Sequence, residues 1–230
     1  RIAIVNENGV SRNSPTALSF WTNAGGTDTT AATEKMRINS SGNVGIEVTP
    51  ESWENNYPAL QIGGAGALSG HSSGEVYLTD NVYRNGGNWK HINTGAATFY
   101  QATAGKHKFK ITPSASADAN ISWTDAMVID NSGRVTMPSQ PAAVAYTMPD
   151  SNNGTLVYST EKFDNAGNMN LTNGRFTCPV AGVYSVSISG FYNTGRSNNG
   201  DVNIRVNNST YVRATYSNES QSSYVAITGV

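Results

Sequence analysis

The sequence predicts an all-β protein, and three observations support this prediction. First, apolar residues alternate with small polar ones in several short segments, as where Tyr184, Val186 and Ile188 are separated by serines. This period of two sends one set of side chains inward and the other outward on a strand. Second, Asn, Ser, Thr and Gly are abundant, and charged residues make up only 13%. Third, a hairpin-like segment occurs twice, at residues 34–46 and 125–137.

The composition argues against several classes of protein. The net charge is -1 and the pI is about 6.3, so no overall field attracts nucleic acid or an anionic membrane. No apolar run approaches the ~18 residues that a membrane span requires, so we expect no membrane insertion. The single cysteine, Cys178, excludes an intrachain disulfide. We expect its thiol to be buried on the inward face of a strand.

The first strands are expected at residues 1–5 and 17–22, ahead of the repeated segment. Each copy of that segment predicts a β-hairpin. Met-x-Ile is a strand with one apolar face, Asn/Asp-x-Ser-Gly is a tight turn, and Val-x-Ile/Met is the returning strand. The turn requires Gly42 and Gly133 in a left-handed conformation.

A hairpin of this kind exposes one apolar face and two unpaired edges, and is barely stable alone. Such repeats must stack on neighbours or on symmetry copies, so we expect a trimeric shaft. Residues 1–50 hold its first repeat, and residues 51–137 hold a small inserted β-domain and the second repeat. Residues 63–74 are expected to form a glycine-serine loop. The strands expected around it are 59–62, 76–83, 89–92, 97–100 and 106–111.

Residues 138–230 predict a β-sandwich behind a proline-containing linker at residues 138–141. Apolar and polar residues alternate in most of its segments, which indicates two-faced strands. Pro179 and Gly182 separate two of these strands by a bend. The strands are expected to include residues 156–158, 163–164, 176–180, 184–189, 202–206 and 212–216.

One motif of the sandwich resembles a known family. It is Gly-x-Phe-Thr-Cys-Pro-x-x-Gly-x-Tyr, from Gly174 to Tyr184. This order resembles the start of the C1q-like domain, a jelly roll of the tumour-necrosis-factor type, and roughly residues 141–230 are similar to that domain. The resemblance implies a homotrimeric binding head without catalytic apparatus, with further strands beyond Val230.

The repeat carries a second resemblance. Residues 36–46, Met-Arg-Ile-Asn-Ser-Ser-Gly-Asn-Val-Gly-Ile, resemble a repeat of bacteriophage tail-fibre and other virion appendage proteins. The sequence departs from that pattern at Glu47, where such proteins tend to carry Gly. Together the two resemblances imply an extracellular virion fibre or spike on the tail or capsid. Its partners are then two further copies, other virion proteins, and a glycan or protein of the host cell surface.

Residues for catalysis, cofactors or metals are sparse. His91 and His107 have no Cys or carboxylate at ligand spacing, and we expect both to be solvated. Residues 118–120 and 198–201 offer oxygens to calcium, but Asn and Asp in turns usually cap their own backbone. A glycan-degrading enzyme needs a converging pair of carboxylates, and the acidic residues are scattered. We therefore expect no enzyme and no cofactor. The scattered acids include Glu51, Glu54, Glu75 and Asp80.

Candidate receptor contacts lie in a polar loop between two predicted strands of the sandwich. Loops on a rigid sandwich commonly carry binding specificity. Three tyrosines are expected opposite the core, where they suit contact with a receptor or a neighbouring subunit: Tyr192, Tyr211 and Tyr224. The candidate loop residues are Asn193, Thr194, Arg196, Asn198 and Asn199.

The favoured function is host adsorption by a trimeric virion fibre that binds a receptor through its head loops. Three weak contacts on one shaft act together through a high effective concentration. Three alternatives stay open: a secreted C1q-like adhesion or lectin module, a glycan-degrading tailspike, and a capsid or collar decoration fibre without a receptor role. The sequence does not separate a tail fibre from a collar fibre, because both use the same shaft and head.

Overall fold

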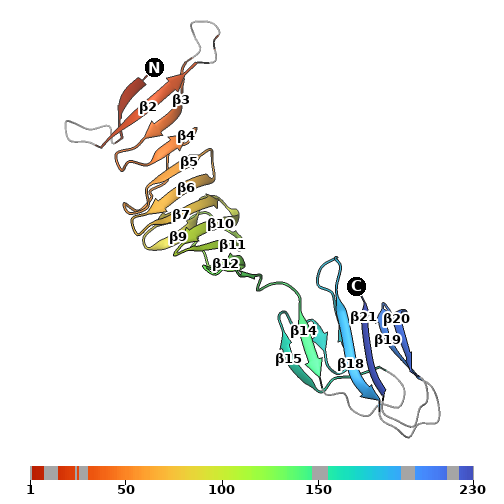
Figure 1. Cartoon of the computed structure of the whole chain (residues 1–230). Coiled ribbons are helices and arrows are strands. Elements are labelled where there is room, and N and C mark those ends of the chain that lie inside the picture. The colour runs from red at the N-terminus through yellow and green to blue at the C-terminus, as the bar shows by residue number, and fades with distance from the viewer. Residues whose placement is uncertain are drawn as a thin grey trace. The chain divides into compact units, whose positions relative to one another are not determined.

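The computed structural model shows an all-β chain of two compact units, residues 1–140 and 141–230 (Figure 1). No helix occurs among the described residues, and so none of them forms a helix able to cross a membrane. Each unit is considered by itself below. The structure describes residues 2–7, 15–23, 25, 31–146, 155–192, 200–216 and 223–229.

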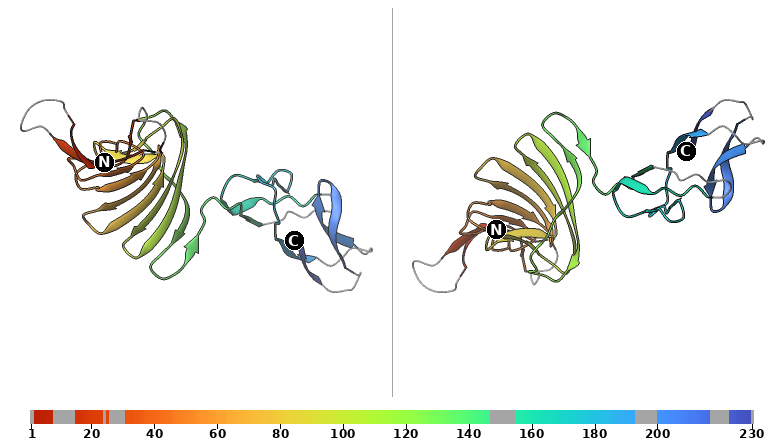
Figure 2. Two further views of the ribbon diagram at one scale, coloured as in Figure 1. Left: turned by 90° about the horizontal axis from the view of Figure 1, so that it is seen from above. Right: turned by 90° about the horizontal axis from the view of Figure 1, so that it is seen from below.

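Unit 1 is one eleven-stranded sheet, a ladder in which the strands follow one another in chain order (Figure 1). The strands turn progressively from one to the next (Figure 2), as expected for twisted sheets. The pairing of β4 with β5 is parallel, and the other pairings of this sheet are antiparallel. The strands are β1 (Ile2–Asn6), β2 (Thr16–Thr22), β3 (Thr33–Ile38), β4 (Val44–Ile46), β5 (Ala59–Ile62), β6 (Gly66–His71), β7 (Glu75–Asp80), β10 (Gly95–Thr103), β11 (Lys106–Ala115), β12 (Thr124–Ile129) and β13 (Val135–Thr136).

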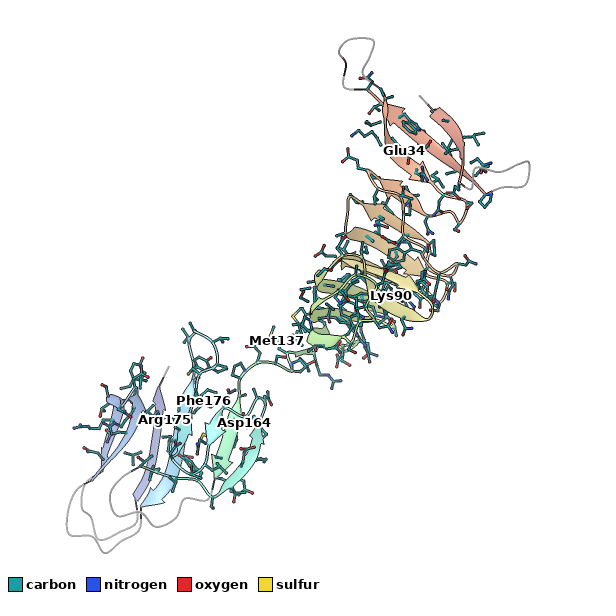
Figure 3. The ribbon with its side chains drawn as sticks, turned by 180° about the vertical axis from the view of Figure 1, so that it is seen from behind. Glu34, Lys90, Met137, Asp164, Arg175 and Phe176 are labelled. Carbon is teal, nitrogen blue, oxygen red and sulfur yellow. The ribbon has the colours of Figure 1, made fainter. Side chains whose placement is uncertain are left out.

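Two hairpins in this sheet, β3–β4 and β12–β13, have turns with matching hydrogen bonds (Figure 3 labels Glu34 in β3 and Met137 just after β13). In the first turn the side-chain oxygen of Asn39 accepts from the amides of Ser41 and Asn43, at 3.1 and 2.9 Å. In the second, Asp130 accepts from the two corresponding amides at 2.8 and 3.0 Å. Gly42 and Gly133 have φ of 83° and 78°, the left-handed conformation that the sequence pattern predicts.

The segment after β4 crosses one face of the sheet before β5 returns parallel to it. Gly45 makes this crossing possible, because a Cβ there would lie 2.1 Å from the carbonyl oxygen of Val48. The crossing begins at Glu47, which has a φ of 56° and whose carboxylate lies 2.8 Å from Lys35 Nζ. The sheet therefore runs without a break through the boundary expected between residues 50 and 51.

The core of unit 1 lies between this sheet and a cover formed by residues 47–58 and the β8–β9 ribbon (Val82–Asn85 and Asn88–His91). Phe99 is central to it, with ring centroids 4.9 Å from both Trp89 and Trp123. The guanidinium of Arg84 closes the outside of this cluster, 5.4 Å from the centroid of Trp89. The buried members are Trp53, Tyr57, Ala59, Ala67, Tyr77, Val82, Tyr83, Ala97 and Phe99.

Two expectations for unit 1 are wrong. Residues 63–74 are not a loop throughout, because β6 lies within them and pairs with β5 and β7. Residues 76–83 are not one strand. The chain turns at Asn81, whose φ is 62° and whose side-chain amide donates to the carbonyls of Asn93 and Ala96, both at 3.0 Å. β8 therefore leaves the sheet to join the cover.

The strands of unit 2 form four two-stranded ribbons. Among its described side chains, the buried apolar one is Ile204, at 8% exposure. The β19–β20 hairpin is nested in sequence between β18 and β21, and β21 lies beside β20. The ribbons are β14 (Ala143–Tyr146) with β15 (Thr160–Asp164), β16 (Met169–Asn170) with β17 (Arg175–Phe176), β18 (Val186–Tyr192) with β21 (Ser223–Gly229), and β19 (Gly200–Val206) with β20 (Ser209–Tyr216).

Three expectations for unit 2 are also wrong. Residues 156–158 form no strand, because the backbone there passes close to Gly174, where a Cβ would lie 1.9 Å from Leu156 O. The strand expected at residues 176–180 ends at Phe176 (labelled in Figure 3), and Pro179 offers no amide hydrogen with which pairing could resume. The loop that follows is closed by Tyr184, whose hydroxyl donates to Val180 O at 2.8 Å. Cys178 in this loop is exposed, not buried.

Candidate interaction surface

The strand register divides the residues of the ladder between two faces. Directly opposed residues on neighbouring strands point to the same face, and successive residues point to opposite faces. Successive residues therefore differ sharply in exposure, as Tyr77 at 2% and Leu78 at 59% do. We call the face that carries Tyr77 and Phe99 the covered face, and the face that carries Leu78 the open face.

One unbroken column of directly opposed residues crosses the open face, and every member is apolar or aromatic. We call it the central column. Several members reach solvent in the single chain, with exposures of 81% for Ile4, 45% for Leu68 and 39% for Phe109. The column takes one residue from each of ten strands: Ile4, Leu18, Ile38, Val44, Leu60, Leu68, Leu78, Tyr100, Phe109 and Met127.

The residues that flank the central column alternate between apolar and polar stretches along the ladder. On one side, β1 to β5 continue the apolar surface, and the next three strands break it with Gly66, Asp80 and Thr98. On the other side, Asn6 and Thr16 are polar, and from β7 onward the residues are apolar except for His107 of β11. The apolar strip is therefore about two side chains wide and has polar margins. Its apolar flanking residues are Ile2, Phe20, Met36, Ile46, Ile62, Val76, Ala102, Ile111, Ile129 and Val135.

Tyr100 is the member of the central column with a polar group, and this group is partnered at the margin. Its hydroxyl lies 2.7 Å from Nδ1 of His107, and its ring centroid lies 5.2 Å from that of Phe109. The ring of Tyr100 can thus contribute apolar contact without an unsatisfied hydroxyl.

The covered face has a different character, because it carries polar groups that are hydrogen-bonded within the chain, and Glu75 is the best connected of them. Glu75 accepts hydrogen bonds from the hydroxyl of Thr103 at 2.6 Å, from the amide of Gln101 at 3.2 Å, and from the hydroxyl of Tyr77. The Thr103 bond, followed by the Tyr77 bond, lowers the pKa of Glu75. Burial, followed by the bond to Glu75, raises the pKa of Tyr77. This carboxylate therefore acts as a structural acceptor at the edge of the core.

The other acidic residues considered for a glycan-degrading site each make a different contact. Glu54 pairs with Arg84 at 3.4 Å, and Asp80 is exposed on the open face. Burial, and then the charge of Asp118, raise the pKa of Glu51. Asp118 in turn accepts a hydrogen bond from the hydroxyl of Tyr83 at 2.6 Å. The first contact joins the two parts of the cover, and the second joins the cover to the segment between β11 and β12.

The candidate metal ligands are placed as follows. Among the described residues, no group of three His, Cys, Asp or Glu side chains lies close enough to hold a metal ion. His91 is 1% exposed, so the expectation that it is solvated is wrong: it lies on β9 in the cover, where its backbone also pairs with Asp118 and Ala119. His107 is exposed beside Tyr100. Of the candidate calcium residues 198–201, positions 198 and 199 lie outside the described residues.

The predicted receptor contacts fall mostly where the structure gives no side-chain description. Asn193, Thr194, Arg196, Asn198 and Asn199 lie outside the described residues. Tyr192 and Tyr224 belong to β18 and β21, where Tyr192 is opposed by Ser223 and Tyr224 by Phe191. Tyr211 is 58% exposed on β20.

Sequence reasoning missed the central column, although its signal was present. Nearly every expected strand of unit 1 alternates, and each carries an apolar residue at the position that the column uses. What was lacking is the register between strands far apart in the chain. No family model matches the sequence, no curated protein matches it, and no solved structure matches the chain.

Proposed function

We propose that this protein is a structural component of a bacteriophage fibre or spike, a homotrimer that attaches the virion to its host. Unit 1 forms the shaft and unit 2 forms the C1q-like jelly-roll head. The observation that carries the proposal is the ladder itself. Eleven strands succeed one another in a single direction, and the sheet has an apolar face that the described residues leave open.

The two similar hairpins support the assignment of unit 1 as a shaft. Their turns share four backbone contacts around Asn39 and Asp130, although about ninety residues separate them. Each hairpin continues a stack of strands and gains its stability from its neighbours, as in other repeat proteins. A protein of this kind serves as a spacer that holds a binding unit away from a particle.

Unit 2 supports a head that associates with further copies of the chain. Several of its large apolar side chains are exposed, including Val183 at 84% and Tyr211 at 58%. The nesting of β19 and β20 between the paired strands β18 and β21 is compatible with Greek-key sandwiches. A jelly roll whose sheets pack across subunits would cover such residues.

The mechanism follows from three heads on one shaft. A single contact between a head and a glycan or protein of the host surface is weak. Once one head is bound, the others are held near the surface at a high effective concentration, so that overall avidity exceeds single-site affinity by about 10²–10⁴-fold. Adsorption then needs no chemical step.

The experiment that tests the proposal is the location of the protein on the particle. Gold-labelled antibodies against unit 2 are imaged on virions, and the purified chain is added to host cells before infection. We expect label on a fibre that projects from the particle, and reduced adsorption in the presence of the purified chain.

The other outcomes each overturn a stated part of the proposal. Label on the capsid or collar without competition for adsorption removes the receptor role and leaves a decoration fibre. Release of reducing sugar from host polysaccharide identifies a tailspike enzyme. Virions without any label identify a secreted adhesion or lectin module and reject the virion fibre.

A further inference from the structure

The central column is an exposed apolar surface that crosses nearly the whole ladder of unit 1. We infer that it is the surface through which copies of this chain assemble, with three open faces around one axis and identical strands at the same level. This inference rests on the homotrimer of the proposed function and adds its interface, its orientation and its register.

The size of the surface calls for a partner. Monomeric soluble proteins rarely expose contiguous apolar patches larger than a few hundred Å². Here ten column residues and their flanks form one patch, with Leu78 at 59% and Ile62 at 52% exposure. A stable interface buries about 800 Å² on each partner, which about twenty partly exposed side chains can supply.

The spacing of the column identifies the partner as a second copy. Neighbouring strands lie about 4.8 Å apart, so ten strands present an apolar side chain at that interval over about 43 Å. A helix or a loop has no such period over this length. Another copy of the same ladder has it at every level, and its covered face is already occupied by its own cover.

The narrow width of the strip indicates three copies and not two. Two sheets packed face to face bury all the inward positions of every strand. Here that would bury the polar margins, including Asp80 and Thr98, and remove their polar groups from water. Three sheets around an axis bury the central column at the middle, while the margins lie at three corners that water can reach.

Three identical chains close with rotational symmetry about an axis along the ladder, and such an axis keeps all ladders parallel. Each level then brings the same residue of three chains together, so that Leu18 meets Leu18 near one end and Phe109 meets Phe109 near the other. An antiparallel pair of ladders would instead bring Leu18 toward residues near the far end of its partner.

The test uses single cysteines in the full chain with Cys178→Ser as the background, since Cys178 is exposed. Leu18→Cys and Phe109→Cys chains, one of them carrying a size tag, are refolded separately and as an equal mixture. Each is then treated with a short bis-maleimide. The matched control is Asn88→Cys, at the exposed start of β9 in the cover, which lies on the other face of the sheet from the central column.

We expect Leu18→Cys to cross-link with itself and Phe109→Cys to cross-link with itself, each at least tenfold faster than Asn88→Cys. In the mixture, a Leu18→Cys chain cross-linked to a Phe109→Cys chain would carry one size tag. We expect no such product. Cross-links between Leu18→Cys and Phe109→Cys, or rates equal to that of Asn88→Cys, overturn the inference and leave the location of the protein on virions as a separate question.

A second measurement uses assembly size. Leu68→Glu combined with Leu78→Glu places charges at the middle of the central column, and sedimentation is expected to show about one third of the parent mass. Asn55→Glu combined with Asn88→Glu adds two charges at exposed positions of the cover, away from the central column, and keeps the parent mass. A parent mass retained by the double variant overturns the inference. A parent chain that is itself a folded monomer overturns the homotrimer as well.

Discussion

The two faces of the unit 1 sheet are built from different kinds of side chain. The covered face carries aromatic rings and hydrogen-bonded polar groups, and its residues pack against a cover that the same chain supplies. The open face carries an apolar column with polar margins, and the described part of the chain supplies no cover for it. One chain thus completes half of the packing that its sheet requires.

This difference predicts where a substitution should act. A change on the covered face should alter the free energy of unfolding of the single chain, because the contacts that it removes are intramolecular. A change on the open face should alter unfolding much less and alter association instead. The predictions below pair a covered-face substitution with a control and run from the largest expected effect to the smallest.

The largest effect is expected for Phe99→Ala. Phe99 is 4% exposed and contacts the rings of Tyr77, Trp89 and Trp123. Removal of a buried phenyl ring should lower the free energy of unfolding by about 3–5 kcal/mol, as measured by urea denaturation. The control is Tyr100→Ala, the next residue on the open face, measured at concentrations low enough to keep the chain monomeric. An equal loss for Tyr100→Ala would contradict the difference between the faces.

The next effect is expected for Gly45→Ala, which tests the route of the cover. The added Cβ would lie 2.1 Å from Val48 O and 2.8 Å from Pro50 Cδ. Because Val48 O is a backbone atom, the clash can be relieved only if the main chain moves. We expect a loss of about 3 kcal/mol in urea denaturation. Thr136 holds the corresponding position of the second hairpin, where the chain leaves the sheet. Thr136→Ala should change stability by less than about 0.5 kcal/mol.

These two hairpins also mark how far the sequence could predict the fold. The Asn/Asp-x-Ser-Gly turns were placed correctly, because their left-handed glycines and side-chain caps are local features. The parallel return of β5 and the strand β6 were not foreseen, because their pairing depends on chain crossings that leave little local signal. The central column was missed for the same reason, since it exists only once ten registers are known.

Unit 2 shows the opposite error, in which a local pattern predicted a strand that does not form. Alternation at Phe176, Cys178 and Val180 predicted a strand with a buried thiol, but a strand also needs a partner for its amides. Without a second layer over this segment, Cys178 is exposed and Tyr184 closes a loop instead. The predicted receptor loop is residues 193–200; positions 193–199 lie outside the described residues, and the receptor contact stays a prediction.

A smaller effect is expected for Glu75→Gln at the margin of the covered face. The carboxylate loses its charge while Thr103, Gln101 and Tyr77 still point toward it, so we expect a loss of about 1 kcal/mol at pH 7. The pKa of Glu75 is lowered in the folded chain, so its contribution is complete above the ordinary carboxyl value of 4.5. It is lost as the pH falls through the lowered folded pKa.

The contribution of Glu75 is measured as the difference in urea midpoint between the parent and Glu75→Gln. Urea midpoints of the parent and Glu75→Gln are compared from pH 7 down to pH 3, and the gap between them should close below about pH 4.5. Asp80→Asn is the control, since Asp80 is exposed on the open face. A gap that widens toward acid pH would show that the hydrogen bonds favour the protonated carboxyl.

The smallest effect is expected at Glu47, where the cover begins. Its φ of 56° disfavours any side chain with a Cβ, and β-branched side chains most. Glu47→Val should therefore lower the urea midpoint. Glu47→Gly should leave it unchanged or raise it, because relief of the backbone offsets the loss of the exposed ion pair with Lys35. Lys35→Met removes that ion pair alone. If Lys35→Met and Glu47→Gly lowered the midpoint as much as Glu47→Val does, the ion pair and not the backbone conformation would hold the start of the cover.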